Sequence, residues 1–241
     1  MTKISFGTDG WRAILAENFT FENLAIISQA MSDYLLAESE SPAIAIGYDT
    51  RFMSAQFAKK IGQILHVNGI EVFLSDQYIP TPVLSFTVKN KGLDAGIMVT
   101  ASHNPYYYNG VKFKASYGGS AMEELTKNIE KYLYKNPIPE HAEREVRTYD
   151  FFQDYKKHIE SIVDLDILHS FNENILFDSM HGAGTGFLSS FLKHSAIDID
   201  RINEQSDPYF GGTLPEPIPA NLKKLSQKVK NSAAILGVAT D

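Results

Sequence analysis

The sequence predicts an α/β protein that consists of two consecutive units. Apolar segments of strand length alternate with amphipathic segments of helical period along the 241 residues. The order strand, Asp-bearing loop, helix, strand occurs at 43–74 and again at 174–202, which indicates two copies of one α/β unit. The hydrophobic fraction of 44% is sufficient to build a core.

Composition argues against several functional classes. The formal net charge of −7 is unfavourable for a protein that binds nucleic acid or an acidic membrane surface. There are no cysteines, so neither a disulfide framework nor a thiolate site is expected. Residues Met1–Ser5 lack the apolar core of a signal peptide, and no apolar run approaches the roughly 18 residues that cross a bilayer. We therefore expect a soluble, cytoplasmic protein.

The first half is expected to contain four helices and four strands. Thr20 is placed to cap the first helix and Ser54 the second, while Ser120 and Glu123 form a capping box for the fourth. We predict helices over 20–35, 54–67, 84–88 and 120–134, and strands over 43–46, 70–74, 95–99 and 111–114.

A polar, Pro-containing stretch, 136–147, shows no periodicity and is predicted to link two domains, 1–140 and 141–241. The chain ends at Thr240-Asp241, directly after an apolar strand, where open α/β sheets place ligand groups. We therefore expect the second domain to be truncated. Beyond the link we predict helices over 149–163, 187–193 and 222–230, and strands from 174, over 197–202 and over 233–238.

The stretch MVTASHNPYYYNG, 98–110, carries the most informative polar residues. Ser102 follows a buried strand, where sites concentrate, although a generic loop serine only satisfies a turn. The G-x-S-x-G elbow of α/β-hydrolases is missing. Adjacent side chains diverge on an extended backbone, so a direct pair of Ser102 with His103 is not expected. A hydroxyl among cations such as Lys112 suits a phosphoryl acceptor.

The segment TASHNPYYYNGVKFK resembles the active-site loop of the α-D-phosphohexomutases, the phosphoglucomutase/phosphomannomutase family. Five further segments resemble signatures of this family in the same order along the chain. They are FGTDGWRA (6–13), GYDTR (47–51), FDSMHGAG, GGTLPEPIPANL and the terminal GVATD, which resembles the approach to a metal-binding loop. The resemblance implies two consecutive α/β/α sandwich domains with mixed, mostly parallel sheets, the second truncated, and it implies that a third and a fourth domain are absent.

The resemblance also implies a reaction. Ser102 would be a phosphoserine that exchanges its phosphoryl group with a hexose monophosphate through a hexose 1,6-bisphosphate, which serves as activator. Lys112 would be the general acid/base, Arg12 would lie near the phosphate, and His103 would donate a hydrogen bond or a proton beside the serine. Without the resemblance, the sequence would indicate simpler roles. Lys112 would be a solvated lysine on a strand, Arg12 would form a surface ion pair, and His103 would be a structural residue.

Metal binding is expected to be incomplete in this chain. Asp241 matches the first aspartate of the family's metal loop, so that Ser102 and Asp241 would be ligands of Mg²⁺. Mg²⁺ prefers six oxygen ligands in octahedral geometry, and one aspartate at the end of the chain is not a site. We expect weak metal binding or none, and a fragment with little activity of its own.

Several points stay open from the sequence. Asp49 and Arg51 could steady the serine loop by pairing with each other, or act as charges at a helix start. The HGAGTG run at 181–186 lacks full G-x-G-x-x-G spacing, and tight strand–helix packing explains it better. The roles of Tyr106, Tyr107 and Tyr108, the hexose and the oligomeric state are not determined. Alternative functions are a phosphoglucosamine mutase or a non-catalytic module that binds sugar phosphates.

Overall fold

The computed structural model describes residues 4–140 and 144–241 and divides the chain into two compact units. The first unit comprises the residues up to 49, 53–101 and 107–152, and the second comprises 50–52, 102–106 and 153–241. The serine loop thus groups with the C-terminal part of the chain, and each unit is described by itself. The predicted division between 140 and 141 adjoins residues 141–143, which lie outside the described residues.

The first unit is built on a mixed six-stranded sheet in the order β1-β5-β4-β2-β3-β6. Pairs β2/β3, β2/β4 and β3/β6 are parallel, whereas β5 runs antiparallel to both β1 and β4. The strands are β1 (Gly10–Ile14), β2 (Ala43–Tyr48), β3 (Glu71–Ser75), β4 (Ala95–Val99), β5 (Tyr108–Ala115) and β6 (Thr148–Tyr149), and the helices are α1 (Phe21–Glu38), α2 (Ser54–Val67), α3 (Thr81–Lys91) and α4 (Glu123–Glu130).

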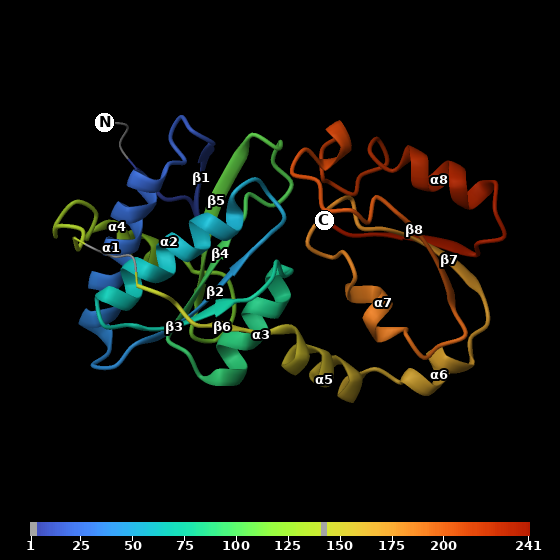
Figure 1. Cartoon of the computed structure of the whole chain (residues 1–241), viewed down its shortest axis with the longest axis horizontal. Coiled ribbons are helices and arrows are strands. Elements are labelled where there is room, and N and C mark those ends of the chain that lie inside the picture. Colours follow the sequence, from blue (N-terminus) through green and yellow to red (C-terminus); the bar gives the residue numbers. More distant parts are fainter. Residues whose placement is uncertain (1–3, 141–143) are drawn as a thin grey trace. The chain divides into compact units, whose positions relative to one another are not determined.

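Helices cover both faces of this sheet. Helices α1, α2 and α4 lie on one face and α3 on the other (Figure 1). Side chains alternate between the two faces along each strand, so that one face carries large apolar residues and the other carries small ones. Ile44, Ile46 and Ile97 point into the large core under α1 and α2, whereas Gly47 and Gly96 lie on the α3 face, where small residues let α3 approach closely. The predicted α/β architecture is confirmed for this unit.

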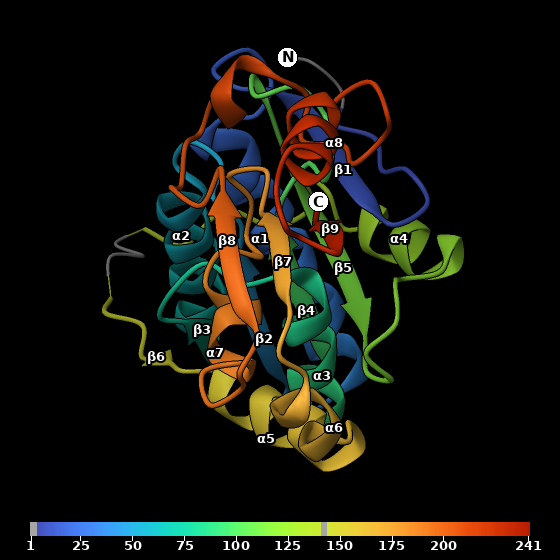
Figure 2. The same ribbon diagram turned by 90° about the vertical axis from the view of Figure 1, so that its right-hand side faces the viewer.

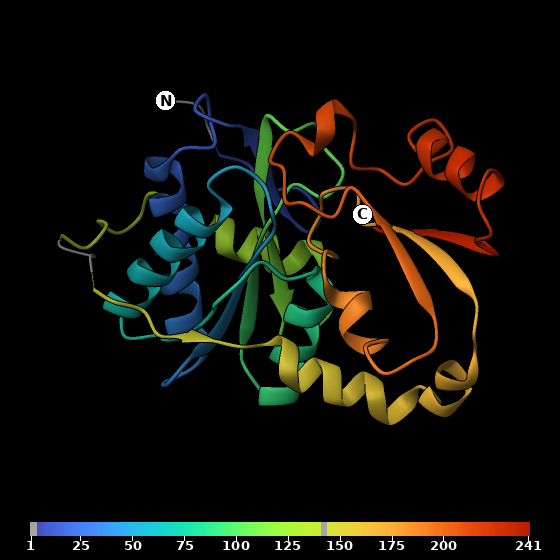
Figure 3. The same ribbon diagram turned by 45° about the vertical axis from the view of Figure 1, so that its right-hand side comes forward.

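The second unit contains a three-stranded sheet in the order β8-β7-β9, with both pairs parallel (Figure 2). Helix α8 packs over Leu176 and Ile202 on one face. The chain reaches this sheet from β6 through α5 and α6 (Figure 3). The elements are α5 (Phe152–Ile162), α6 (Leu165–Ser170), β7 (Asn174–Asp178), α7 (Phe187–Phe191), β8 (Asp198–Ile202), a 3₁₀ turn at Phe210–Gly212, α8 (Lys223–Lys230) and β9 (Leu236–Ala239).

Two predicted helix caps are wrong, because the serines have other partners. The hydroxyl of Ser54 donates to Asp49 Oδ1 at 2.7 Å, and Met53, in a left-handed conformation, precedes the helix instead. Ser120 accepts a hydrogen bond from Lys114 Nζ at 3.1 Å, so α4 starts only at Glu123, without a side-chain cap. The Thr20 cap is confirmed, since its Oγ1 accepts from the amide of Asn23.

Several boundaries also differ from the prediction. Strands β1 and β6 and helix α6 were not expected, since their segments are short or carry polar residues. Helix α3 starts three residues earlier, with a proline in its first turn, a position that requires no amide donor. Helix α4 ends at Glu130 rather than 134, and β9 begins at Leu236 rather than 233. Within the described ranges, the structure contains no helix long and apolar enough to cross a membrane.

Candidate active site

Ser102 occupies a left-handed turn just after strand β4. All five residues of β4 are buried, and the amide of Thr100 continues the pairing by donating to the carbonyl of Gly110 at 2.9 Å. At Ser102 φ is 56°, a conformation that costs a non-glycine residue about 1 kcal/mol or more and that concentrates at functional sites. The side chain is half-buried, so the turn leaves the hydroxyl partly accessible.

The turn brings Ser102 close to His103 and Asp241. Ser102 Oγ lies 3.4 Å from His103 Nδ1 and donates a long hydrogen bond of 3.5 Å to Asp241 Oδ2. The expectation that the adjacent Ser and His side chains diverge is therefore wrong. It assumed an extended backbone, and the left-handed φ of Ser102 folds the two side chains toward each other. A hydroxyl, an imidazole and a carboxylate thus meet within the second unit.

Arg51 holds the backbone of the serine loop. This arginine is 3% exposed and donates to the carbonyl oxygens of Ser102 (2.6 Å), Asn104 (2.6 Å) and Pro105 (3.0 Å). A planar guanidinium presents its donors in a fixed fork, which suits three carbonyls at set positions. Arg51 steadies the loop directly through these carbonyls, while Asp49 accepts from Ser54 at the start of α2.

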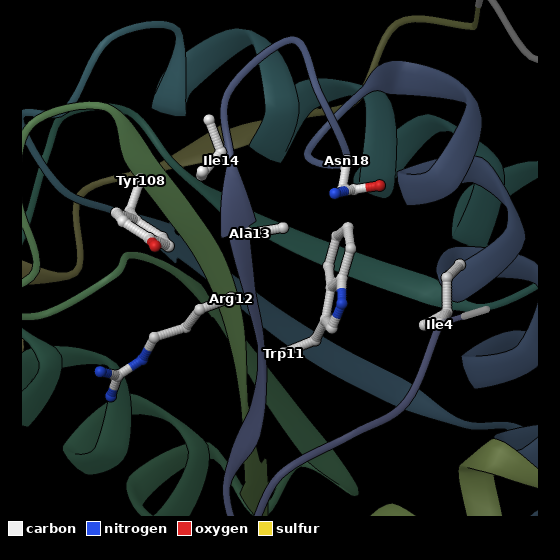
Figure 4. Close-up of a pocket in the computed structure, with 7 residues that line it drawn as sticks. All are labelled: Ile4, Trp11, Arg12, Ala13, Ile14, Asn18 and Tyr108. Carbon is white, nitrogen blue, oxygen red and sulfur yellow. The ribbon is translucent and has the colours of Figure 1, made fainter. Parts of the chain in front are cut away.

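Arg12 and Lys112 lie together in the first unit. Arg12 on β1 pairs with Gly110, two residues from Lys112 on β5, so both side chains project from the same face. Figure 4 shows that side chains alternate between the two sides of β1, with Arg12 on one side and Trp11 on the other. Tyr108 of β5 lies on the same side as Arg12. An open pocket of about 480 Å³ is lined by both cations and by Asp9, whose Oδ2 lies 3.7 Å from Lys112 Nζ.

Gly10 makes this pairing of β1 with β5 possible. Its φ is 149°, a value that L side chains rarely adopt, and a Cβ there would lie 1.9 Å from the carbonyl oxygen of Val111. The backbone of β1 therefore approaches β5 more closely than any side chain permits. This approach positions Asp9 and Arg12 beside Lys112 along the edge of the sheet.

Lys114 is a cation of this region that the sequence analysis missed. It projects from β5 on the same face as Lys112 and is 6% exposed. Burial lowers its pKa, the nearby charge of Lys112 lowers it further, and Asp9 opposes both effects. The spacing of Lys112 and Lys114 could have indicated this, since residues two apart on a strand share a face.

The carboxyl ends of the second sheet bring further polar residues together. Asp178 is buried and accepts from the amide of Met180 (2.8 Å) and from Asn203 Nδ2 (2.9 Å). In the glycine-rich run, a Cβ at Gly184 would lie 2.5 Å from Thr240 Oγ1. Packing thus explains this glycine, as expected, but its partner is the residue after β9 rather than a helix.

Two oxygen groups are available for a metal ion. Ser102 Oγ and Asp241 Oδ2, both predicted ligands, are 3.5 Å apart, and both are hard oxygen donors of the kind Mg²⁺ prefers. Among the described side chains, which exclude those of residues 1–3, 141–143 and His169, no group of three or more His, Asp or Glu is arranged to hold a metal. The pair therefore fits Mg²⁺ in chemical kind but supplies only part of an octahedral ligand set.

The three tyrosines after the serine loop differ in exposure. Tyr106 and Tyr107 are exposed, Tyr108 is half-buried, and the rings of Tyr107 and Tyr108 lie 5.1 Å apart. Tyr108 also contributes to a second pocket, of about 260 Å³, beside Arg12.

Comparisons with known proteins agree along the whole chain. The family model described as phosphoglucomutase/phosphomannomutase, alpha/beta/alpha domain I, matches residues 3–138, and the domain II model matches 153–241. A phosphoglucomutase from Staphylococcus aureus strain MRSA252 is 32% identical, with 100% of this chain and 46% of that protein covered. A protein assigned as a phosphoglucosamine mutase from Methanosphaera stadtmanae is 32% identical, with 98% and 52% covered.

A solved structure supports the same conclusion. A crystal structure assigned as a phosphomannomutase from Thermus thermophilus matches with a TM-score of 0.90 at 36% identity, covering 100% of this chain and 55% of that chain. The chain thus spans about half the length of the relatives that it matches. The predicted resemblance and the predicted pair of α/β/α domains are confirmed.

Proposed function

Because the chain belongs to the phosphoglucomutase/phosphomannomutase family, we propose that the protein of which it forms the matched half interconverts hexose 1-phosphates and hexose 6-phosphates. The observation that carries this proposal is the left-handed turn at Ser102, which directs a half-buried hydroxyl toward His103 and Asp241. A loop backbone held by the buried Arg51 keeps that hydroxyl in place.

In this proposal Ser102 stores the phosphoryl group. The bond between phosphorus and Ser102 Oγ breaks while a bond to a sugar hydroxyl forms, which produces a hexose 1,6-bisphosphate. The other phosphate of that intermediate then returns to Ser102. A loose transition state of phosphoryl transfer requires alignment and neutralised charge more than covalent assistance, and a hydroxyl fixed by a strained turn supplies the alignment.

We assign the proton transfers to His103 and Lys112. His103 Nδ1, 3.4 Å from Oγ, donates a proton to the serine oxygen as the phosphoryl group leaves. Lys112 accepts the proton of the sugar hydroxyl and returns it in the reverse step. Arg12 binds phosphate oxygens, because a guanidinium pairs with them in a bidentate manner.

We further propose that Ser102 and Asp241 contribute two ligands of a Mg²⁺ ion. The ion, when bound, neutralises charge on the transferring phosphoryl group. The substrates in this proposal are hexose phosphates, with a hexose 1,6-bisphosphate as activator, and neither nucleic acid nor membrane is involved. The division into domains 1–140 and 141–241 is part of the same proposal, and so is a cytoplasmic location.

The proposal is tested with the complete gene product and its Ser102→Ala variant. Conversion of glucose 1-phosphate to glucose 6-phosphate is followed in the presence of glucose 1,6-bisphosphate, and the intact mass is measured after incubation with the bisphosphate. We expect turnover and an added mass of about 80 Da for the native protein, the mass of one phosphoryl group, and neither for the variant. Ser161→Ala, at an exposed helix position, is the matched control and retains both.

Undiminished turnover in Ser102→Ala would refute the assignment of the nucleophile. Binding of hexose phosphates without turnover or added mass in the native protein would favour a non-catalytic binding module. A second enzyme candidate, a phosphoglucosamine mutase, is favoured by the relative from M. stadtmanae. Parallel assays with glucosamine 1-phosphate decide between the two substrates, since the better substrate has the higher kcat/KM.

A further inference from the structure

A short turn in the second unit lies against the arginine that holds the serine loop. The guanidinium carbon of Arg51 lies 4.9 Å from the ring centroid of Phe210, within the range of a cation–π contact. Phe210 is 4% exposed, so the contact is desolvated, the condition under which such contacts are strongest. Arg51 is therefore fixed from two sides, by the Phe210 ring and by the loop carbonyls of Ser102, Asn104 and Pro105.

The turn that presents Phe210 is itself strained and held by one carboxylate. Phe210, Gly211 and Gly212 have φ values of 52°, 63° and 76°, and Phe210 is the residue of the three for which this is unfavourable. Asp207 accepts from the amides of Tyr209 (2.9 Å) and Gly211 (3.0 Å), and these bonds lower its pKa. A strained backbone persists only where the surrounding structure holds it in place, and such strain is concentrated at functional sites. The strain in this turn therefore points to a function.

A second contact joins the same two segments. The rings of Tyr106 and Tyr209 lie 4.9 Å apart, tilted by 47°. Tyr106 and Pro105 are adjacent in the serine loop, and Tyr209 and Phe210 are adjacent in the turn. The loop and the turn are therefore joined by two neighbouring contacts, the aromatic pair of Tyr106 with Tyr209 and the cation–π pair of Arg51 with Phe210.

We propose that residues 207–212 are a positioning element for Ser102, which acts through Phe210 on Arg51 and through Arg51 on the serine loop. This inference rests on the proposed function, in which Ser102 exchanges a phosphoryl group. Phe210 and Asp207 are positioning residues and touch neither substrate nor phosphoryl group. Their contribution is to hold the left-handed turn at Ser102 in one conformation.

The test compares Phe210→Leu with Phe210→Tyr in the complete gene product. Leucine fills much of the same volume without a π face, whereas tyrosine keeps the ring. Three quantities are measured: the rate of phosphoryl uptake from glucose 1,6-bisphosphate, the ³¹P signal of the phosphoserine, and the hydrogen exchange of the backbone amides in 102–106, where Pro105 has none. In this uptake the bond from phosphorus to a sugar oxygen breaks and the bond to Ser102 Oγ forms, while the serine hydroxyl gives its proton to His103 and the sugar oxygen receives one from Lys112.

We expect Phe210→Leu to slow the uptake by about tenfold, to shift the ³¹P signal and to accelerate exchange in 102–106. Phe210→Tyr stays close to the native protein in all three. Phe177→Leu is the matched control, since Phe177 is 3% exposed in β7 of the same unit. It loses stability but leaves the ³¹P signal and the exchange of 102–106 unchanged.

The outcomes separate the two proposals. If the native protein takes up no phosphoryl group, the proposed function fails, while faster exchange of 102–106 in Phe210→Leu still supports the positioning element. If the native protein takes up the group and Phe210→Leu behaves as Phe177→Leu does, the positioning element is refuted. Should Phe210→Leu not fold, Asp207→Ala, at a half-buried position, is expected to give the same three changes to a smaller degree.

Discussion

At the scale of single residues, the position of Ser102 depends on Arg51, because one guanidinium binds three carbonyls of the loop. Arg51→Ala leaves these carbonyls without their charged donor, and we expect a loss of about 2–3 kcal/mol in the free energy of unfolding. Arg51→Lys recovers only part of this, because an ammonium cannot reproduce the planar fork. Urea denaturation of both variants measures the effect, and equal stability of Arg51→Ala and the native protein would contradict it.

Lys114 gives a prediction about pH. Its folded-state pKa is lowered from 10.5, first by burial and then by Lys112, with Asp9 opposing and Ser120 as hydrogen-bond partner. The unfolded chain therefore binds more protons between the lowered pKa and about 10.5, so the native protein gains stability as pH rises through that window. Lys114→Met removes the buried charge and is expected to be more stable than the native protein at neutral pH.

The advantage of Lys114→Met shrinks as the pH approaches 10.5, since the native amine is then neutral as well. Thermal unfolding of both proteins between pH 7 and 10.5 checks this, with Lys89→Met, at an exposed position of α3, as the control for the loss of one positive charge. A stability difference between Lys114→Met and the native protein that is constant across this range would be evidence against the prediction.

Functional residues that lie at the end of a strand could be predicted from the sequence. Ser102 could be singled out because it lies in the loop that follows the apolar run ending at Val99, and Arg51 because it lies in a loop after another strand. The contact of Ser102 with His103 could not be predicted, since it depends on a left-handed φ that no local pattern around this non-glycine residue signals. The burial of Lys114 could not be predicted either, because Lys114 pairs with Gly96 on the face of the sheet that α3 approaches, an arrangement that only the folded unit shows.

At the scale of elements, strand β1 shows what the hydrophobic pattern leaves out. Its five residues contain Gly10 and Arg12 and carry a weak alternation, so they were not predicted as a strand. The pairing with β5 defines it, and that pairing requires a glycine at position 10. The central strands β2 and β4 were predicted well because continuous burial makes them uniformly apolar.

Gly10→Ala tests this account of β1. The new Cβ would lie 1.9 Å from a backbone oxygen at an unfavourable φ, so we expect a loss of at least about 3 kcal/mol and faster hydrogen exchange in β1 and β5. Gly69→Ala is the matched control: its φ is 90°, but no atom lies within 4 Å of the new methyl group, and backbone strain alone costs about 1–2 kcal/mol. Similar losses in the two variants would show that close approach does not determine the β1 pairing.

At the scale of the whole molecule, the second sheet ends in an exposed apolar strand. Strand β9 lies at the edge of the order β8-β7-β9, and Ile235, Leu236 and Val238 are 50%, 42% and 36% exposed. Leu236 and Val238 continue the face formed by the buried Ile175 and Phe177 of β7. The repeat in the sequence correctly indicated a second α/β unit. Which strand lies at the exposed edge of its sheet depends on the strand order, and the repeat does not specify that order.

An exposed apolar edge strand offers unpaired backbone groups to another chain, so we expect the 241-residue chain to self-associate as its concentration rises. Val238→Lys places a charge on this edge and is expected to reduce the association, because a second copy would have to desolvate the ammonium in order to pair. Sedimentation velocity over a range of concentrations measures the effect. Ile162→Lys introduces the same charge at a 65% exposed position of α5 and serves as the control. If both variants reduce association equally, net charge rather than the β9 edge controls it, whereas an effect confined to Val238→Lys identifies β9 as the surface through which the copies pair.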